Sequence, residues 1–174
     1  MKHIMIVLAL SFAASLAFAK DIPVDMGGKT ITVKTTTTNR EIVAKDMGTG
    51  DQKTPLGCSL LYYSRFSKGD IAEASNLSTA PKATAEKWEK YRERTGVAEF
   101  KKDMAAYFTS KNVVLAELTL DEAVMLVVKT ADYTAGQIYV KQNDKWLMAE
   151  SLKTEAGTAF GKILSKIQDG EIKF

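Results

Sequence analysis

Four short strand-like segments near the C-terminal end of the chain constrain the fold more than any other feature. They cover residues 113–120, 123–130, 136–141 and 145–150, and only two to five residues separate each from the next. Parallel neighbours need a long crossover connection, so links this short place consecutive strands antiparallel. The sequence therefore predicts a four-stranded antiparallel meander.

This predicted meander is apolar on both of its faces. In the first strand Val114 and Leu118 alternate with Val113 and Leu115, and the second strand, 123–130, shows the same pattern. A sheet with one face in water would keep that face polar. We therefore expect helices over one face, and the N-terminal hairpin, the final helix or a second subunit over the other.

Helices are predicted on both sides of the meander in the sequence. Apolar residues at three- and four-residue spacing predict helices over 56–67 and 71–77, and a longer helical region over 84–110 that breaks near Gly96. A final helix is predicted over 155–167, with one apolar stripe. Together with the meander, these helices predict the α+β class.

The segment before the first helix is predicted to form a hairpin. Residues 30–34 alternate polar and apolar side chains, residues 41–44 form a second short strand, and Thr38-Asn39 is a turn-prone pair between them. Gly27-Gly28 marks another turn before these strands. Residues 48–55 combine glycine, charge and proline, which is typical of a loop.

The first 19 residues have the pattern of a cleavable signal peptide. Lys2 and His3 form a short basic start, residues 4–12 are apolar, and Ala17-Phe18-Ala19 is an A-x-A cleavage site. The apolar run is too short to cross a bilayer, and no cysteine follows the cleavage site. We expect a mature protein without a membrane span, located in the periplasm or secreted.

The mature chain is predicted to lack the groups needed for several kinds of chemistry. His3, the only histidine, lies in the predicted signal peptide, which excludes catalytic triads and histidine zinc sites. Cys58 is the only cysteine, so no intrachain disulfide forms. We expect Cys58 to be a small buried hydrophobe, with a reactive or intermolecular thiol as the alternative. We expect no metal and no cofactor.

The charge pattern does not favour nucleic acid as a partner. The 24 basic and 21 acidic residues give a formal charge of +3, and the two signs are interleaved along the chain. A protein that follows a phosphate backbone would gather its basic residues into a patch or stripe.

Two segments resemble the nuclear transport factor 2-like superfamily. Residues 60–74, LLYYSRFSKGDIAEA, resemble its first helix with the G-D step that follows, and residues 136–148, GQIYVKQNDKWLM, resemble its last hairpin. The resemblance covers about residues 56–151. It implies a curved antiparallel sheet, here the four-stranded meander plus the N-terminal hairpin, wrapped around the N-terminal helices with a cavity between them. It also implies dimerisation through the outer sheet face, so a homodimer is one expectation.

The predicted organisation has four parts. Residues 1–19 form the signal peptide, 20–55 an N-terminal β-hairpin extension and loop, 56–151 the α+β domain that resembles the superfamily, and 152–174 the C-terminal helix. The extension and the final helix lie outside the pattern of the superfamily.

The favoured function is non-catalytic binding of a small apolar or amphiphilic ligand by an exported protein. Aromatic residues at helical spacing and in the last hairpin predict a pocket between the helices and the sheet. The candidate binding residues are Trp88, Tyr91, Tyr107, Tyr139 and Trp146 as walls and Arg92 as an anion anchor.

Two other functions remain open. One is a periplasmic protein-interaction module, such as an inhibitor, an immunity-type protein or a secretion accessory. The other is an isomerase- or cyclase-type enzyme that uses Glu117, Glu150 or Asp103 with Tyr107 or Tyr139 as hydrogen-bond donor. Burial would have to raise the pKa of such a carboxylate, and no pair of carboxylates at a telling spacing singles itself out.

Overall fold

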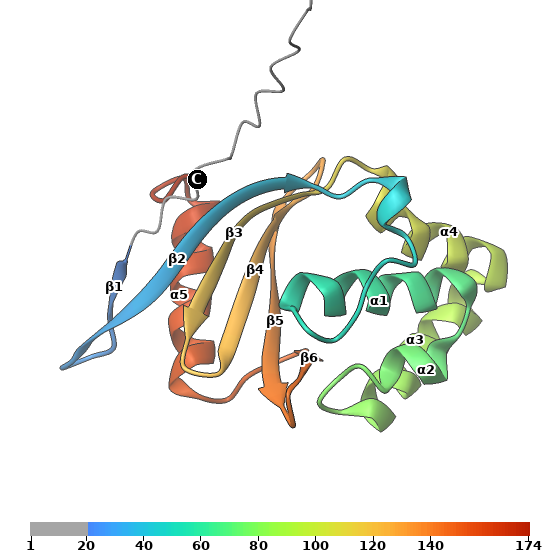
Figure 1. Ribbon diagram of the computed structural model, residues 1–174, viewed down its shortest axis with the longest axis horizontal. Helices are drawn as coiled ribbons and strands as arrows, with labels where there is room; N and C mark the ends of the chain where they lie inside the picture. The colour runs from blue at the N-terminus through green and yellow to red at the C-terminus, as the bar shows by residue number, and fades with distance from the viewer. Residues whose placement is uncertain (1–20) are drawn as a thin grey trace, which may run out of the picture.

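The computed structural model describes residues 21–174, and the predicted signal peptide lies outside the described residues. The fold is α+β, with a curved antiparallel sheet and helices on both of its faces, as predicted (Figure 1). The six strands follow one another in the sheet in chain order. They are β1 (Ile22–Asp25), β2 (Thr30–Glu41), β3 (Val113–Leu120), β4 (Ala123–Lys129), β5 (Thr134–Gln142) and β6 (Lys145–Ala149).

The predicted four-stranded meander is confirmed as β3 to β6. Two of its three links, β3–β4 and β5–β6, are tight turns that contain residues in the left-handed conformation: Asp121 has φ 53°, Asn143 φ 48° and Asp144 φ 61°. Asparagine and aspartate tolerate this conformation better than most residues, and two of them in succession suit a two-residue hairpin loop. The local sequence at these two turns therefore agrees with the antiparallel pairing.

The N-terminal hairpin exists and the predicted strand over 30–34 lies within β2, but the predicted second strand over 41–44 and the predicted turn at Thr38-Asn39 are wrong. Its turn lies at Gly27 and Gly28, which both have positive φ, and β1 pairs with residues 30–33 of β2. The predicted turn at Asn39 is instead a bulge inside β2, where the register against β3 shifts between Thr37 and Arg40. Pairing with β3 on both sides of the bulge keeps the strand continuous, so long-range contacts outweigh the local turn preference.

Four helices lie on the inner side of the curved sheet, with α1 next to the strands, and a fifth lies on its outer face (Figure 1). The inner helices are α1 (Pro55–Lys68), α2 (Ile71–Ser75), α3 (Pro81–Thr95) and α4 (Val97–Thr109), and the outer one is α5 (Glu155–Gln168). The predicted break of the long helical region is confirmed at Gly96, which separates α3 from α4 with φ 86°. A 3₁₀ turn, η1 (Ala44–Asp46), follows β2.

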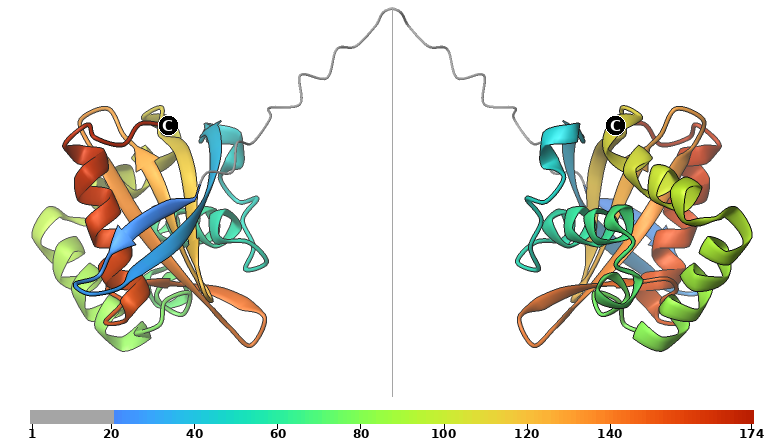
Figure 2. Two further views of the ribbon diagram at one scale, coloured as in Figure 1. Left: turned by 90° about the vertical axis from the view of Figure 1, so that its left-hand side faces the viewer. Right: turned by 90° about the vertical axis from the view of Figure 1, so that its right-hand side faces the viewer.

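The sheet therefore separates two hydrophobic cores, as its two apolar faces predicted. On the inner face the side chains of β4 pack with α1 and α4, and on the outer face they pack with α5 and β1. Figure 2 shows the sheet between α5 on one side and the other helices on the opposite side. The inner core includes Phe66, Phe100, Phe108, Leu126 and Val128; the outer core includes Val33, Met125, Val127, Phe160 and Ile163. Of the covers considered for the outer face, the structure uses both the final helix and the N-terminal hairpin.

The outer face is also the one through which the resemblance implies dimerisation, and α5 packs on it in this chain. Within residues 21–174, no helix combines the length and the apolar character required to cross a bilayer.

Candidate functional site

A buried polar cluster lies between α1, α4 and β5, and the Gln137 side chain is its centre. Hydroxyls of Ser59 and Tyr107 approach Gln137 Oε1 at 2.9 and 3.2 Å. The Tyr139 hydroxyl donates to the same oxygen at 3.1 Å, and Gln137 Nε2 donates to Tyr63 Oη at 3.5 Å. Ser59 Oγ and Tyr107 Oη are themselves 2.6 Å apart. We call these five residues the hydroxyl–amide cluster.

Regular secondary structure explains why these side chains meet. Ser59 and Tyr63 are four residues apart on α1 and so lie on one side of that helix. Gln137 and Tyr139 are two residues apart on β5 and so share the inner face of the sheet. Tyr107 comes from α4, and its ring stacks on Tyr63 with the centroids 3.9 Å apart and the planes 13° from parallel.

The tyrosines of the cluster are neutral over the physiological pH range. Burial raises the pKa of Tyr107 to about 12, and burial also raises the pKa of Tyr63 and Tyr139 above the ordinary value of 10.0. Their hydroxyls therefore act as hydrogen-bond donors and acceptors and do not act as bases. The cluster offers polar groups at fixed positions within an apolar core.

Two hollows border the cluster, and both are lined in part by Tyr63, Gly136 and Gln137. The larger has a volume of about 490 Å³ and lies between the end of α4 and the turn that joins β4 to β5. The smaller has a volume of about 250 Å³ and lies between α1, α3 and β6. The other residues at the larger hollow include Asp103, Tyr107, Asn112, Asp132 and Tyr133, and those at the smaller include Tyr62, Lys87, Trp88, Met148 and Glu150.

The larger hollow has an acidic lining. Asp103 and Asp132 line it, and no lysine or arginine does so among the residues that the structure describes. Asn112 is buried there: its Nδ2 donates to the Tyr107 carbonyl at 2.9 Å, and its Oδ1 has no hydrogen-bond partner within residues 21–174. The electrostatics therefore favour neutral or cationic ligands over anions.

The structure does not bring the six predicted binding residues into one pocket. Trp88 lines the smaller hollow and donates through Nε1 to the Tyr62 hydroxyl at 3.0 Å. Tyr107 lines the larger hollow. Tyr139 is fully buried within the cluster and lines neither of the two hollows.

The other three predicted binding residues line neither hollow. Tyr91 donates to Asp103 at 2.6 Å, and Arg92 forms an ion pair with Glu89 on the same helix. Trp146 packs against the inner core from β6. Arg92 therefore lies outside both hollows, where it could not anchor an anion bound in either.

The sequence analysis missed Ser59, Tyr63 and Gln137, which belong to the hydroxyl–amide cluster, and Asn112, which lines the larger hollow. One signal could have found two of them, namely a polar residue at a position that faces the apolar core. Gln137 is such a residue on a strand, and Ser59 is such a residue on a helix. A polar residue at such a position needs a partner, because burying it unpaired is unfavourable.

The carboxylates considered for acid–base chemistry lie at separate places. Asp103 lines the larger hollow, and Glu150 lines the smaller one, where it pairs with Lys87 at 3.1 Å. Glu117 is half-buried on β3, and desolvation raises the pKa of its carboxyl. No two of the three share a hollow.

Cys58 lies in the inner core with no exposed surface, and burial raises the pKa of its thiol to about 12. Across residues 21–174, no three histidine, cysteine, aspartate or glutamate side chains gather into a candidate metal site. Comparison of the chain with protein families, curated proteins and solved structures found no match.

Proposed function

We propose that this chain is an exported, non-catalytic protein that binds a small amphiphilic molecule in the larger hollow. The observation that carries the proposal is the hydroxyl–amide cluster, which presents buried and neutral polar groups at the wall of a cavity of about 490 Å³. Small-molecule sites commonly have volumes of about 300–1,000 Å³ and pair an apolar lining with a few fixed polar groups.

The lining indicates the chemistry of the ligand. The stacked rings of Tyr63 and Tyr107 provide a flat surface for an aromatic or aliphatic body. Asp103 and Asp132 favour positive charge, and their carboxylates are acceptors for a ligand N–H or O–H. We therefore infer that the ligand is neutral or cationic and carries at least one hydrogen-bond donor.

Two features support binding over catalysis. The buried tyrosines hold their protons well above neutral pH, and the three carboxylates considered as acids or bases do not meet in one hollow. Membership of the nuclear transport factor 2-like superfamily is part of the proposal, supported by the helices within the curve of the sheet and by the position of the hollow between them.

The test uses two probes of similar shape and opposite charge. Phenethylamine and hydrocinnamate are titrated into the full chain, and binding is followed by NMR at the methyl groups of Val128 and Ala135, which border the larger hollow. We expect saturable shifts with phenethylamine and much weaker ones with hydrocinnamate. Preference for the anion, or no saturable shift with either probe, would contradict the proposed ligand chemistry.

A variant series separates the site from non-specific binding. Tyr107→Phe removes one hydroxyl at the wall of the hollow and should weaken phenethylamine binding by roughly 2- to 10-fold, the effect of one hydrogen bond. Tyr62→Phe is the matched control, because the Tyr62 hydroxyl accepts from Trp88 Nε1 and lines only the smaller of the two hollows. Native mass spectrometry of the protein purified after export would show a copurifying small molecule. A stoichiometric protein partner in its place would favour the interaction module.

A further inference from the structure

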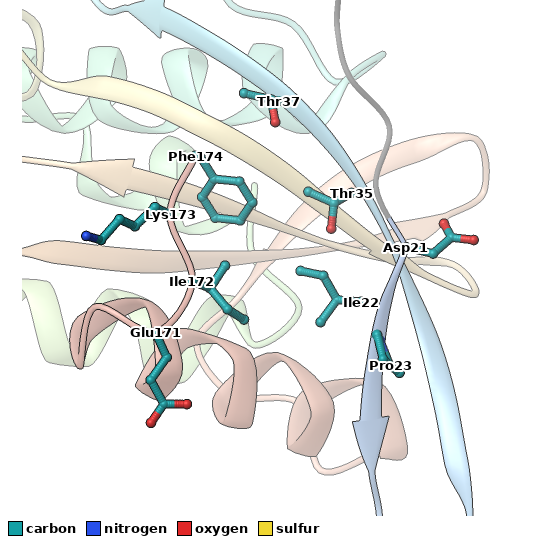
Figure 3. Close-up of a pocket in the computed structure, with 9 residues that line it drawn as sticks. All are labelled: Asp21, Ile22, Pro23, Thr35, Thr37, Glu171, Ile172, Lys173 and Phe174. Atoms are coloured by element: carbon teal, nitrogen blue, oxygen red, sulfur yellow. The ribbon is translucent and has the colours of Figure 1, made fainter.

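A third cavity lies on the outer side of the sheet, away from the hydroxyl–amide cluster. It has a volume of about 310 Å³ and is enclosed by the start of β1, by β2 and by the segment that follows α5 (Figure 3). Ile22 and Pro23 form one wall, Ile172 and Phe174 form the opposite wall, and Thr35 of β2 lies between them. The cavity is therefore apolar on its sides, and two threonines of β2, Thr35 and Thr37, contribute hydroxyls to its lining.

Thr35 is the unusual residue of this cavity. Its side chain is 2% exposed, and its Oγ1 has no hydrogen-bond partner among the residues that the structure describes. The oxygen points into the cavity, toward Ile22 (Figure 3). On the same face of β2, the neighbouring position is Val33, which is fully buried and packs in the outer core.

The hydroxyl is unfavourable for folding by itself. Valine has the same shape as threonine and would pack in this apolar setting without an unpaired polar atom, whereas a buried hydroxyl without a partner loses its hydrogen bonds to water. Packing alone therefore does not account for threonine at this position. A ligand in the cavity that carries a complementary polar group would account for it.

We propose that this cavity is a second binding site, for a small neutral amphiphile with an alkyl chain and a hydroxyl or carbonyl group. The polar group pairs with Thr35 Oγ1, and the alkyl chain lies between the walls made by Ile22 and Ile172. The charged groups at the rim are mixed, with Asp21 and Glu171 acidic and Lys173 basic, so they favour no net charge on the ligand. The site is independent of the function proposed above.

The experiment titrates n-octanol into the full chain and follows the methyl groups of Ile22 and Ile172 by NMR. We expect saturable shifts at both residues and nuclear Overhauser effects from the alkyl chain to them. Thr35→Val should weaken octanol binding by roughly 3- to 10-fold, the effect of one hydrogen bond. The control is Thr36→Val, which makes the same change at the next residue, where the side chain is exposed on the other face.

Thermal unfolding of the free variants separates lost binding from lost folding. Thr35→Val should melt at the same temperature as the parent chain or higher, because it removes an unpaired buried hydroxyl. Weaker octanol binding in a variant that is equally stable would support the site. Equal affinity of Thr35→Val and the parent chain would refute the role of the hydroxyl. Shifts confined to Val128 and Ala135 would place octanol in the inner hollow and refute the second site.

Discussion

Replacing Gln137 by leucine should destabilise the fold by about 2–4 kcal/mol. The change removes the oxygen that Ser59, Tyr107 and Tyr139 share. Ser59 and Tyr107 remain 2.6 Å apart and keep each other as partners, but the fully buried Tyr139 hydroxyl loses its acceptor. One orphaned buried hydroxyl costs about 1–3 kcal/mol, and each weakened hydrogen bond adds about 0.5–1.5 kcal/mol.

The reasoning can be tested with a second substitution, Tyr139→Phe, in both backgrounds. In the parent chain it removes one satisfied hydrogen bond and should cost about 1 kcal/mol. In the Gln137→Leu background it removes the orphaned hydroxyl, so it should restore stability by about 1 kcal/mol. Urea unfolding followed by circular dichroism measures all four free energies. Gln142→Leu is the control, since Gln142 is exposed on the same strand. If Tyr139→Phe costs the same in both backgrounds, the two side chains are not coupled and the cluster is not the unit described above.

Three other predictions concern the tyrosines, Cys58 and two glycines. The unfolding free energy should fall as pH rises from 10 toward 12, because the unfolded chain loses tyrosine protons near pH 10 while Tyr107 in the folded chain holds its proton to about pH 12. Urea titrations across this pH range, with tyrosine ionisation recorded by absorbance, test whether the free energy falls. The Cys58 thiol, whose pKa burial raises to about 12, should react slowly with Ellman's reagent at pH 8 in the native chain and rapidly in denaturant, and equal rates would contradict its burial. Gly136→Ala should lower the free energy of unfolding by about 1–3 kcal/mol, because the added methyl meets the Met125 sulfur. Gly161→Ala has open space within α5 and should raise the free energy of unfolding by up to about 1 kcal/mol. Thermal unfolding compares the two variants.

Much of the fold could be predicted because its decisive signals are local. The short links of the meander, the apolar alternation on both faces of the strands and the glycine that ends α3 each lie within a few residues. The hairpin could not be placed correctly, because the choice between a turn and a bulge at Asn39 depends on β3, more than 70 residues away. No pattern near Asn39 contains that information.

The candidate site was harder to predict because it is made by contacts between elements. Aromatic residues at helical spacing indicated correctly that α3 and α4 carry rings on their inner sides, but not which rings border open space. Trp88 and Tyr107 do so, whereas Tyr139 is enclosed by its neighbours. The amide of Gln137 holds the hydroxyls of the cluster together. A single glutamine in a strand belongs to no sequence pattern that would indicate this role.

Strand β4 is buried along nearly its whole length, from Ala123 to Val128. Its side chains point alternately into the inner and the outer hydrophobic core. A change in the packing of either core therefore affects the same seven-residue strand. The amide protons of β4 should consequently be the last to exchange with deuterated solvent. Removing α5 would expose the side chains on the outer face of this strand. A chain shortened in this way would expose an apolar sheet face to water, and it would aggregate or self-associate through that face.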